Sequence, residues 1–177
     1  MSLERIARRA SLLARLITVL IIALPLAALI TLGTGTAATE TLSQVYGIKV
    51  MPDDPGAGPT LVWIAVEAAR LGLFMWVLWG VRGWLVACAR GAVFAGQTAQ
   101  HIQRIGRRMV VLAIAHVVGN TIIIAALTWN NPPGQRALAI GFGSTEGLLL
   151  LAAGLMTLFG WIQSEAARLA EENEGFV

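Results

Sequence analysis

The sequence predicts an all-α membrane protein, a four-transmembrane-helix bundle, and two observations support this class. Hydrophobic residues make up 56% of the 177-residue chain and charged residues only 13%, and the mean hydropathy is +0.72. Four apolar stretches, about 12–32, 61–81, 109–127 and 138–162, are each long enough to cross a hydrocarbon layer about 30 Å thick at about 1.5 Å per residue. No stretch between them is long enough for a separate domain, so residues 1–177 are expected to form one transmembrane domain.

The first span resembles a signal peptide, but it differs from one in length. The stretch 12–32 follows a basic start, yet it is longer than the roughly 7–15 apolar residues of a cleavable signal. We therefore predict an uncleaved first helix that is kinked or loosened at Pro25. The outer loop 33–60 that follows is expected to be a solvated cap over the bundle, with ligand recognition as the alternative.

The loop 82–108 between the second and third spans contains more structure than a simple connection. A glycine-rich stretch at 91–96 interrupts it, and Ile102, Ile105 and Met109 then recur at spacings of three and four. This spacing is helical, so we predict an interfacial cytoplasmic helix that lies on the membrane surface before the third span. The polar surface of this helix carries Arg104, Arg107 and Arg108. These arginines are expected either to anchor lipid headgroups or to dock a cytoplasmic partner.

Basic residues outside the spans, counted together with Arg15 in the first turn of the first span, are distributed unevenly between the two sides of the membrane. One side holds both tails and the loop 82–108, with Arg5, Arg8, Arg9, Arg15, Arg82, Arg90, Arg104, Arg107, Arg108 and Arg168. The opposite side carries only Lys49 and Arg136. The positive-inside rule therefore predicts that the N- and C-termini are cytoplasmic. The net charge of +3 then reflects topology and contact with the anionic lipid bilayer, and we expect no direct nucleic-acid binding.

The fourth span contains small residues that share one helix face, Gly143, Gly147 and Gly154. Small residues let neighbouring helices approach closely, so we expect this face to pack within the bundle, with a homodimer as the alternative. The cytoplasmic tail 163–177 continues the helix with acidic residues around Arg168. It is expected to pair with the basic loop on the same membrane face or to remain a solvated end.

Five polar residues lie within the predicted spans: Glu67, Arg70, His116, Asn120 and Glu146. An ionisable group near the bilayer centre costs roughly 2.5–3.5 kcal/mol, so these side chains should face inward and find partners. Helix rise places all of them except His116 at about 9–14 Å below the outer surface, with His116 one turn deeper. We predict one intramembrane polar cluster in which Arg70 neutralises one carboxylate, while the other is protonated or reaches water or a cation. The cluster is either a polar clasp that fixes helix register or an ion, proton or small-ligand site.

Cofactor and enzyme chemistry find little support in the sequence. His116 is the only histidine in the predicted spans, whereas haem held by two histidines needs both to face inward. His116 with Glu146 supplies too few ligands for a metal. The sequence contains no Ser-His-Asp spacing and no phosphate loop, and its single cysteine, Cys88, excludes an intrachain disulfide. We therefore expect no cofactor, no metal and no catalytic residue.

Two segments carry a resemblance to a known family. Residues 91–109, GAVFAGQTAQHIQRIGRRM, form a Phe-containing turn that leads into a helix carrying Ile105-Gly106. The last span runs through GLLL at 147–150 and FG at 159–160 into the acidic EENE at 171–174. Over the second to fourth spans, and more weakly elsewhere, the chain resembles the bacterial four-span membrane proteins of domain-of-unknown-function family 2975. The resemblance implies a bacterial inner membrane and no established activity, and some members lie beside small helix-turn-helix regulators, which implies a signalling pair.

Three hypotheses about function are consistent with these features. The first is a non-enzymatic regulatory or sensory module that docks a cytoplasmic regulator through residues 91–108 of the basic second loop and the acidic tail. The second is a small ion- or proton-coupled transporter or channel-like oligomer that uses Glu67, Arg70 and Glu146. The third is an accessory subunit of a larger membrane complex, bound to the other membrane-complex subunits through the glycine face of the fourth span.

Overall fold

The computed structural model describes residues 3–33, 56–90 and 96–174, and these residues are helical apart from the chain ends and one long connection. The helices are α1 (Leu3–Gly33), α3 (Ala57–Ala89), α4 (Gly96–Leu127) and α5 (Ser144–Glu174). Each contains a segment that is long and apolar enough to cross a membrane. Within the described ranges no residue is in a strand, so the predicted all-α, multi-pass membrane protein is confirmed. Most of the predicted outer loop 33–60 and most of the break at 91–96 lie outside the described residues.

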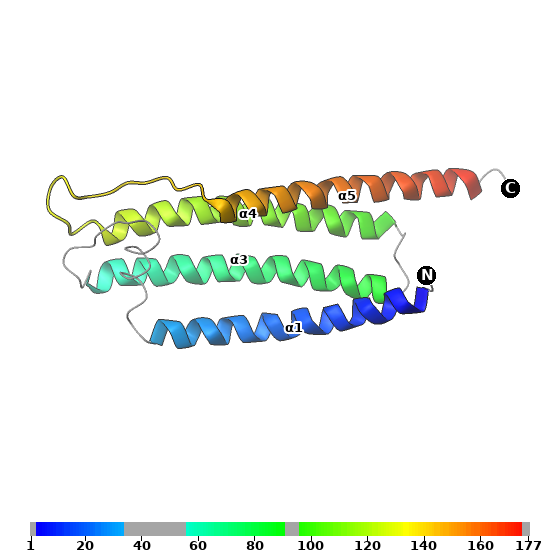
Figure 1. Cartoon of the computed structure of the whole chain (residues 1–177), viewed down its shortest axis with the longest axis horizontal. Coiled ribbons are helices and arrows are strands. Elements are labelled where there is room, and N and C mark those ends of the chain that lie inside the picture. The colour runs from blue at the N-terminus through cyan, green and yellow to red at the C-terminus, as the bar shows by residue number, and fades with distance from the viewer. Residues whose placement is uncertain (1–2, 34–55, 91–95, 175–177) are drawn as a thin grey trace.

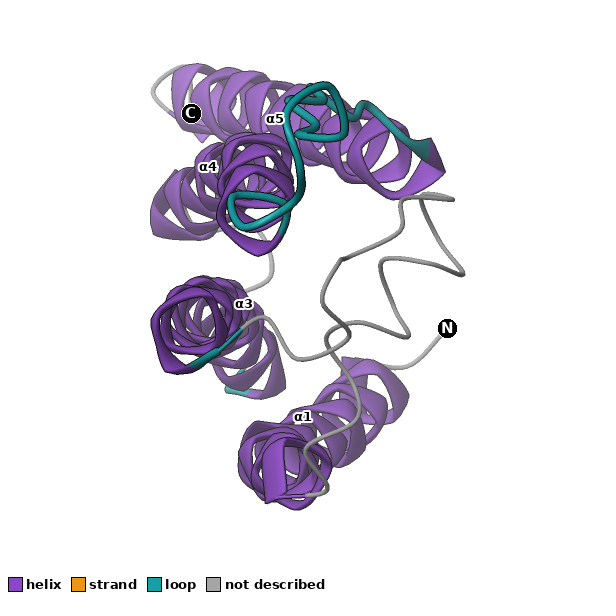
Figure 2. Ribbon diagram, turned by 90° about the vertical axis from the view of Figure 1, so that its left-hand side faces the viewer, coloured by secondary structure: helices purple, strands orange, loops and turns teal. Residues whose placement is uncertain are grey.

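The helices lie side by side with similar axis directions (Figure 1). The two chain ends lie at one end of the molecule, called the terminal end below, and the connection 128–143 lies at the opposite, loop end. Packing contacts join α1 to α3, α3 to α4, and α4 to α5. The view along the helices shows that they form an open arc with α1 and α5 at its two ends (Figure 2). As a result, α1 is anchored chiefly by α3.

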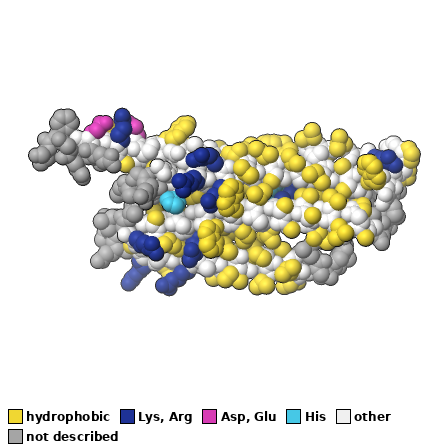
Figure 3. Space-filling model, turned by 180° about the vertical axis from the view of Figure 1, so that it is seen from behind, with side chains coloured by type: hydrophobic (Ala, Val, Ile, Leu, Met, Phe, Trp, Pro, Cys, Tyr) yellow, Lys and Arg dark blue, Asp and Glu magenta, His cyan; other side chains and the backbone are white. Residues whose placement is uncertain are grey.

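The outer surface of the bundle is apolar, as expected for helices surrounded by lipid. Hydrophobic side chains cover the middle of the molecule, and basic side chains gather at the terminal end (Figure 3). Leu16 and Leu151 are largely exposed, whereas Val77 of α3 packs in a buried cluster with Ile105 and Leu112 of α4. Since lipid tails are as apolar as leucine, close packing rather than removal of surface from water holds these helices together.

Two glycines let α4 and α5 approach each other closely. A Cβ atom at Gly106 would lie 2.6 Å from Thr157 Oγ1 and 3.0 Å from the carbonyl oxygen of Ala153. On the partner helix, a Cβ atom at Gly160 would lie 3.1 Å from the carbonyl oxygen of Ala99. Backbone atoms oppose each glycine, so a larger residue would push the two helices apart. These contacts make α4 and α5 the most closely joined pair.

The predicted interfacial helix is not supported as a separate element. Residues 97–109 and the third span belong to one continuous helix, α4. Ile102 and Ile105, which were expected to face the membrane surface, are buried within the bundle at 3% and 2% exposure. A spacing of three and four identifies an apolar helix face, but it does not distinguish a face covered by lipid from a face covered by another helix.

The helices also differ from the predicted spans at their ends. α1 continues through Pro25 without a break in the helix, α3 extends to Ala89, and α5 continues to Glu174. The fourth span begins later than predicted, because residues 138–143 are not helical and α5 starts only at Ser144. The connection extends past the end of α4 and then runs back beside it to α5 (Figure 1).

The last part of this connection, residues 137–142, is called the return segment below. Exposed residues alternate with partly buried ones along it, with Leu138, Ile140 and Phe142 outward and Ala137, Ala139 and Gly141 covered. Ala137 and Ala139 pack against a buried cluster of α4, formed by Ile123, Ile124 and Leu127. The Thr128 hydroxyl accepts a hydrogen bond from the Ala137 N–H at 3.1 Å. An alternation with a period of two is typical of an extended chain. The apolar composition of a short stretch does not by itself distinguish an extended segment from part of a buried helix.

Candidate functional site

Arg70 is the centre of the polar residues within the spans. It lies on α3, and its side chain is only 10% exposed. Its Nη1 donates to Glu67 Oε1 at 2.7 Å, one turn away on the same helix. Its Nη2 donates to Asn120 Oδ1 at 2.6 Å and to the carbonyl oxygen of His116 at 2.8 Å, both on α4. A single guanidinium therefore pairs with a carboxylate and joins two helices.

Gly119 provides the space in which Arg70 lies. A Cβ atom at Gly119 would be 2.7 Å from both Nε and Nη2 of Arg70, and 2.8 Å from Cγ1 of Val66. The Nε atom of Arg70 is buried and has no hydrogen-bond partner among the described residues. Gly119 is not among the residues predicted from the sequence, because a lone glycine has no partner at four-residue spacing. The available signal was its position between His116 and Asn120 in an otherwise apolar span.

Glu146 has a different role from the one that its charge suggested. It is the third residue of α5, and its Oε2 accepts a hydrogen bond from the N–H of Gly143 at 2.8 Å. This is the glutamate half of a capping box, where a carboxylate satisfies a free N–H and lies close to the positive end of the helix dipole. The predicted depth of Glu146 assumed a helix from residue 138, whereas the observed helix begins six residues later.

His116 connects this helix start to the Arg70 group. Its Nδ1 lies 3.8 Å from Glu146 Oε1, which is within ion-pair distance when the imidazole is protonated. The Glu146 side chain is 5% exposed and that of His116 is 28% exposed. The five predicted polar residues thus form a continuous set across α3, α4 and α5, in which Glu67 pairs with Arg70 and Glu146 lies beside His116.

The three arginines predicted for docking do not share one environment. Arg104 and Arg107 are exposed on α4. Arg108 instead lies against α3, where its Nη1 donates to the carbonyl oxygen of Trp76 at 2.9 Å. Its guanidinium carbon is 4.6 Å from the centroid of the Trp76 ring, a cation–π geometry. A Cβ atom at Gly80 would lie 2.5 Å from Arg108 Nη1, so Gly80 leaves room for this contact.

The predicted packing glycines of the fourth span do not face α4. A Cβ atom at Gly154 would meet nothing within 4 Å, and one at Gly147 would meet only Phe142 Cε1 at 3.9 Å. Gly143 lies before the helix, where its N–H is capped by Glu146. The expectation that this face packs inside the bundle is therefore wrong: α5 turns a different face, marked by Gly160, toward α4.

The tail of α5 forms charge pairs within its own helix. Arg168 Nη2 lies 2.5 Å from Glu165 Oε1, and Nη1 lies 3.8 Å from Glu172 Oε1. All three side chains are more than half exposed, so each pair contributes little to stability. Among the described residues, no group of three or more His, Cys, Asp or Glu side chains is arranged to hold a metal ion.

Comparisons with known proteins add no relative from which a role can be transferred. No protein-family model, no curated protein and no solved structure matches this chain.

Proposed function

We propose that this protein is a non-enzymatic regulatory or sensory module of a bacterial inner membrane that docks a cytoplasmic regulator at its terminal end. The basic residues at that end support a cytoplasmic orientation under the positive-inside rule. The resemblance of residues 91–109 and 147–174 to family 2975 supports a role in a signalling pair. The resemblance remains a prediction.

The end of α5 carries this proposal, because it continues past the start of α4 at the terminal end (Figure 1). The four helices are of similar length, 31 to 33 residues, which corresponds to about 46–50 Å at about 1.5 Å per residue. A hydrocarbon core is only about 30 Å thick, so each helix extends beyond it by about 16–20 Å in total. The close contacts at Gly106 and Gly160 hold α4 and α5 together toward the terminal end. The start of α4 and the end of α5, together called the projection below, form a helical surface on which a partner can dock.

The charges on this projection are suited to a polar contact. Arg104 and Arg107 are exposed on α4, one turn apart, and α5 adds Glu165, Arg168 and Glu172. Mixed charges at the rim of an interface contribute more to partner choice and association rate than to affinity. Arg108 is not included in the docking surface, because it is held against Trp76.

A pull-down of the full chain from its own membranes in mild detergent tests the proposal. We expect a soluble regulator to copurify in stoichiometric amount, and the variant Arg104→Ala/Arg107→Ala to retain at least tenfold less of it. The matched control is Arg15→Ala/Arg90→Ala, which removes two exposed arginines elsewhere at the same end and should retain the regulator. Equal retention by both variants would exclude docking through Arg104 and Arg107.

The open face around Gly154 favours a second candidate, an accessory subunit of a larger membrane complex. A side chain at Gly154 would meet nothing within the chain, so another membrane subunit can approach there. The variant Gly154→Leu should then lose membrane subunits in the same pull-down while the bundle remains folded. Transport is less well supported, because Arg70 is held by three acceptors and Glu146 caps a helix. Unchanged ion dependence in Glu67→Gln and Glu146→Gln would exclude it.

A further inference from the structure

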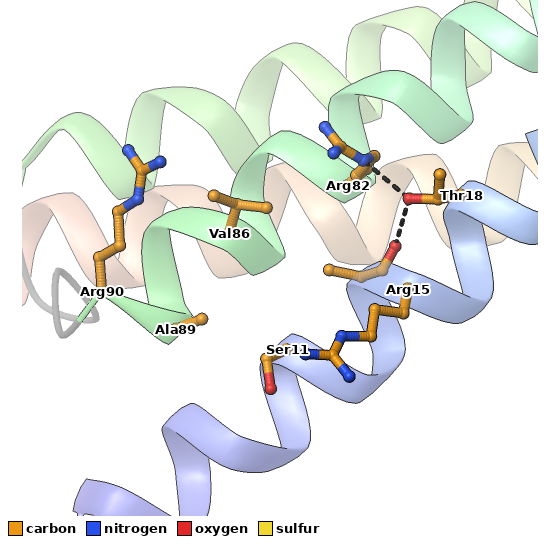
Figure 4. A pocket seen from close by; sticks show the side chains of 8 residues that line it. Ser11, Arg15, Thr18, Arg82, Val86, Ala89 and Arg90 are labelled. Carbon is orange, nitrogen blue, oxygen red and sulfur yellow. Dashed lines mark hydrogen bonds between the residues drawn. The ribbon is translucent and has the colours of Figure 1, made fainter.

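A cavity of about 260 Å³ opens between α1 and α3 (Figure 4). Its lining includes three arginines, Arg15 of α1 and Arg82 and Arg90 of α3. Two hydroxyl residues of α1, Ser11 and Thr18, also line it, and the other lining residues are alanine and valine. None of the residues that line the cavity carries a carboxylate, so its electrostatic potential is strongly positive.

Arg82 is held in place at this cavity. Its Nε donates to Thr18 Oγ1 at 2.9 Å, and the Thr18 hydroxyl donates in turn to the carbonyl oxygen of Ala14 at 2.8 Å. Figure 4 shows this chain of two hydrogen bonds between the helices. The guanidinium carbon also lies 5.6 Å from the centroid of the Trp79 ring. These contacts fix a cation at the boundary between α1 and α3 before any ligand arrives.

The cavity lies where the apolar part of the bundle ends. Ser11 immediately precedes the first apolar stretch, and Arg82 immediately follows the second. The ends of spanning helices lie at the level of the lipid headgroups, where tryptophan and arginine side chains are favoured. Ala14 and Val86 lie between the levels of Arg82 and Arg90, and beyond Thr18 toward the membrane interior α1 exposes apolar side chains such as Val19 and Ile22. A charged group with apolar chains attached to it matches this arrangement.

We propose that this cavity binds the phosphate of an anionic phospholipid headgroup. Guanidinium groups pair with phosphate oxygens in a forked geometry, and basic pockets between transmembrane helices are suited to anionic headgroups. The bound lipid bridges α1 and α3, and α3 is the main packing partner of α1 among the described helices. A soluble phosphate ester shares this chemistry, so the test separates the two sources. The inference is independent of the docking proposed above, because the cavity and the projection use different arginines.

Native mass spectrometry of the full chain in detergent, with added lipid, tests this site. We expect phosphatidylglycerol to bind at least tenfold more tightly than phosphatidylcholine, and inorganic phosphate at equal concentration not to displace it. Each basic residue near a membrane surface contributes about fivefold to the binding of anionic lipid. The variant Arg15→Gln/Arg90→Gln should therefore bind phosphatidylglycerol about 25-fold more weakly. Both positions are exposed, and circular dichroism should show an unchanged helix content.

The control variant is Arg104→Gln/Arg107→Gln, which removes the same charge from the same end outside the cavity. It should bind phosphatidylglycerol as the wild-type protein does. An equal loss of phosphatidylglycerol binding in both variants would show that the lipid binds through the general positive charge of the terminal end and not at this cavity. Equal binding of phosphatidylcholine, or no loss in Arg15→Gln/Arg90→Gln, would overturn the proposal. Displacement by inorganic phosphate would assign the cavity to a soluble phosphate compound instead of a lipid.

Discussion

At the scale of single residues, Arg70 shows how a charged group is accommodated between apolar helices. Its charge is balanced by Glu67 on its own helix, and its other hydrogen bonds reach His116 and Asn120 on α4. An arginine that faced lipid would carry a large insertion cost, whereas three acceptors offset most of that cost. These hydrogen bonds support the clasp hypothesis, in which Arg70 fixes how α3 lies against α4.

The hydrogen bond between Arg70 and Asn120 should be measurable as a coupling. Arg70→Met should lower the free energy of unfolding by about 2–3 kcal/mol, because it leaves buried acceptors without a donor. In a double-mutant cycle with Asn120→Leu, we expect a coupling energy of about 1–2 kcal/mol. Unfolding in mixed detergent micelles provides the measurement. Additive effects of the two substitutions would show that the clasp does not stabilise the bundle.

Gly119 should be intolerant of even one added methyl group. A Cβ atom there would overlap Arg70 and Val66, so Gly119→Ala should destabilise the protein by about 1–3 kcal/mol despite the better helix propensity of alanine. The matched control is Gly72→Ala on α3, where an added Cβ atom meets nothing within 4 Å. That substitution should stabilise the helix by up to about 1 kcal/mol. The same unfolding assay compares the two, and a neutral Gly119→Ala would contradict the role of Gly119.

At the level of secondary structure, the return segment shortens the fourth span, because residues 138–143 are not helical. Non-helical backbone is tolerated at membrane depth only where protein covers it. Here the side that faces α4 carries Ala137 and Ala139, and the segment is joined to α4 through Thr128. The opposite side presents larger apolar side chains, which suits contact with lipid.

A nitroxide scan over residues 137–142 should distinguish an extended segment from a helix. Collision with dissolved oxygen should be frequent for labels at Leu138, Ile140 and Phe142 and rare at the alternate positions, because the former are exposed. The scan requires Cys88→Ser, since Cys88 is the only cysteine. Labels along residues 149–155 of α5 provide the control and should show the helical period of 3.6. A period of 3.6 in both regions would show that the fourth span is helical from about residue 138, as the sequence predicts.

At the scale of the whole molecule, the helices form an open arc instead of a closed ring. α1 packs chiefly on α3 at one end of the arc, while α4 and α5 form a tightly joined pair at the other. Both chain ends lie at the terminal end, as an even number of spans requires. The distribution of arginines then predicts which side of the membrane that end occupies.

Labelling of intact cells with a membrane-impermeant maleimide should establish this orientation. In the Cys88→Ser background, we expect Gln135→Cys at the loop end to react in intact cells. Ser164→Cys at the terminal end should react only after permeabilisation, although both positions are exposed. Equal labelling of the two variants in detergent is the control. The opposite pattern would place the terminal end outside and remove the support for a cytoplasmic partner.

Part of the candidate site was predictable because depth along a helix follows from residue number. The constant rise per residue of a helix predicts similar membrane depths for Glu67, Arg70 and Asn120. In the structure, hydrogen bonds join these three side chains. The same calculation misjudged Glu146, because its helix begins at Ser144 and not near residue 138. The packing glycines were also misassigned. Spacing shows which residues share a face, but the neighbouring helix decides which face is covered.

The class of protein, the four apolar segments and the set of intramembrane polar residues could all be predicted from the residues alone. Length and hydropathy are local properties, so they can be read without knowing any contact. Three features required the packed structure: 97–109 continues into α4, Gly106 and Gly160 join α4 to α5, and Arg82 lines a cavity with Arg15. Those features depend on which helices are neighbours and how they are rotated. In a lipid environment, an apolar pattern looks the same on a face that meets lipid and on a face that meets protein.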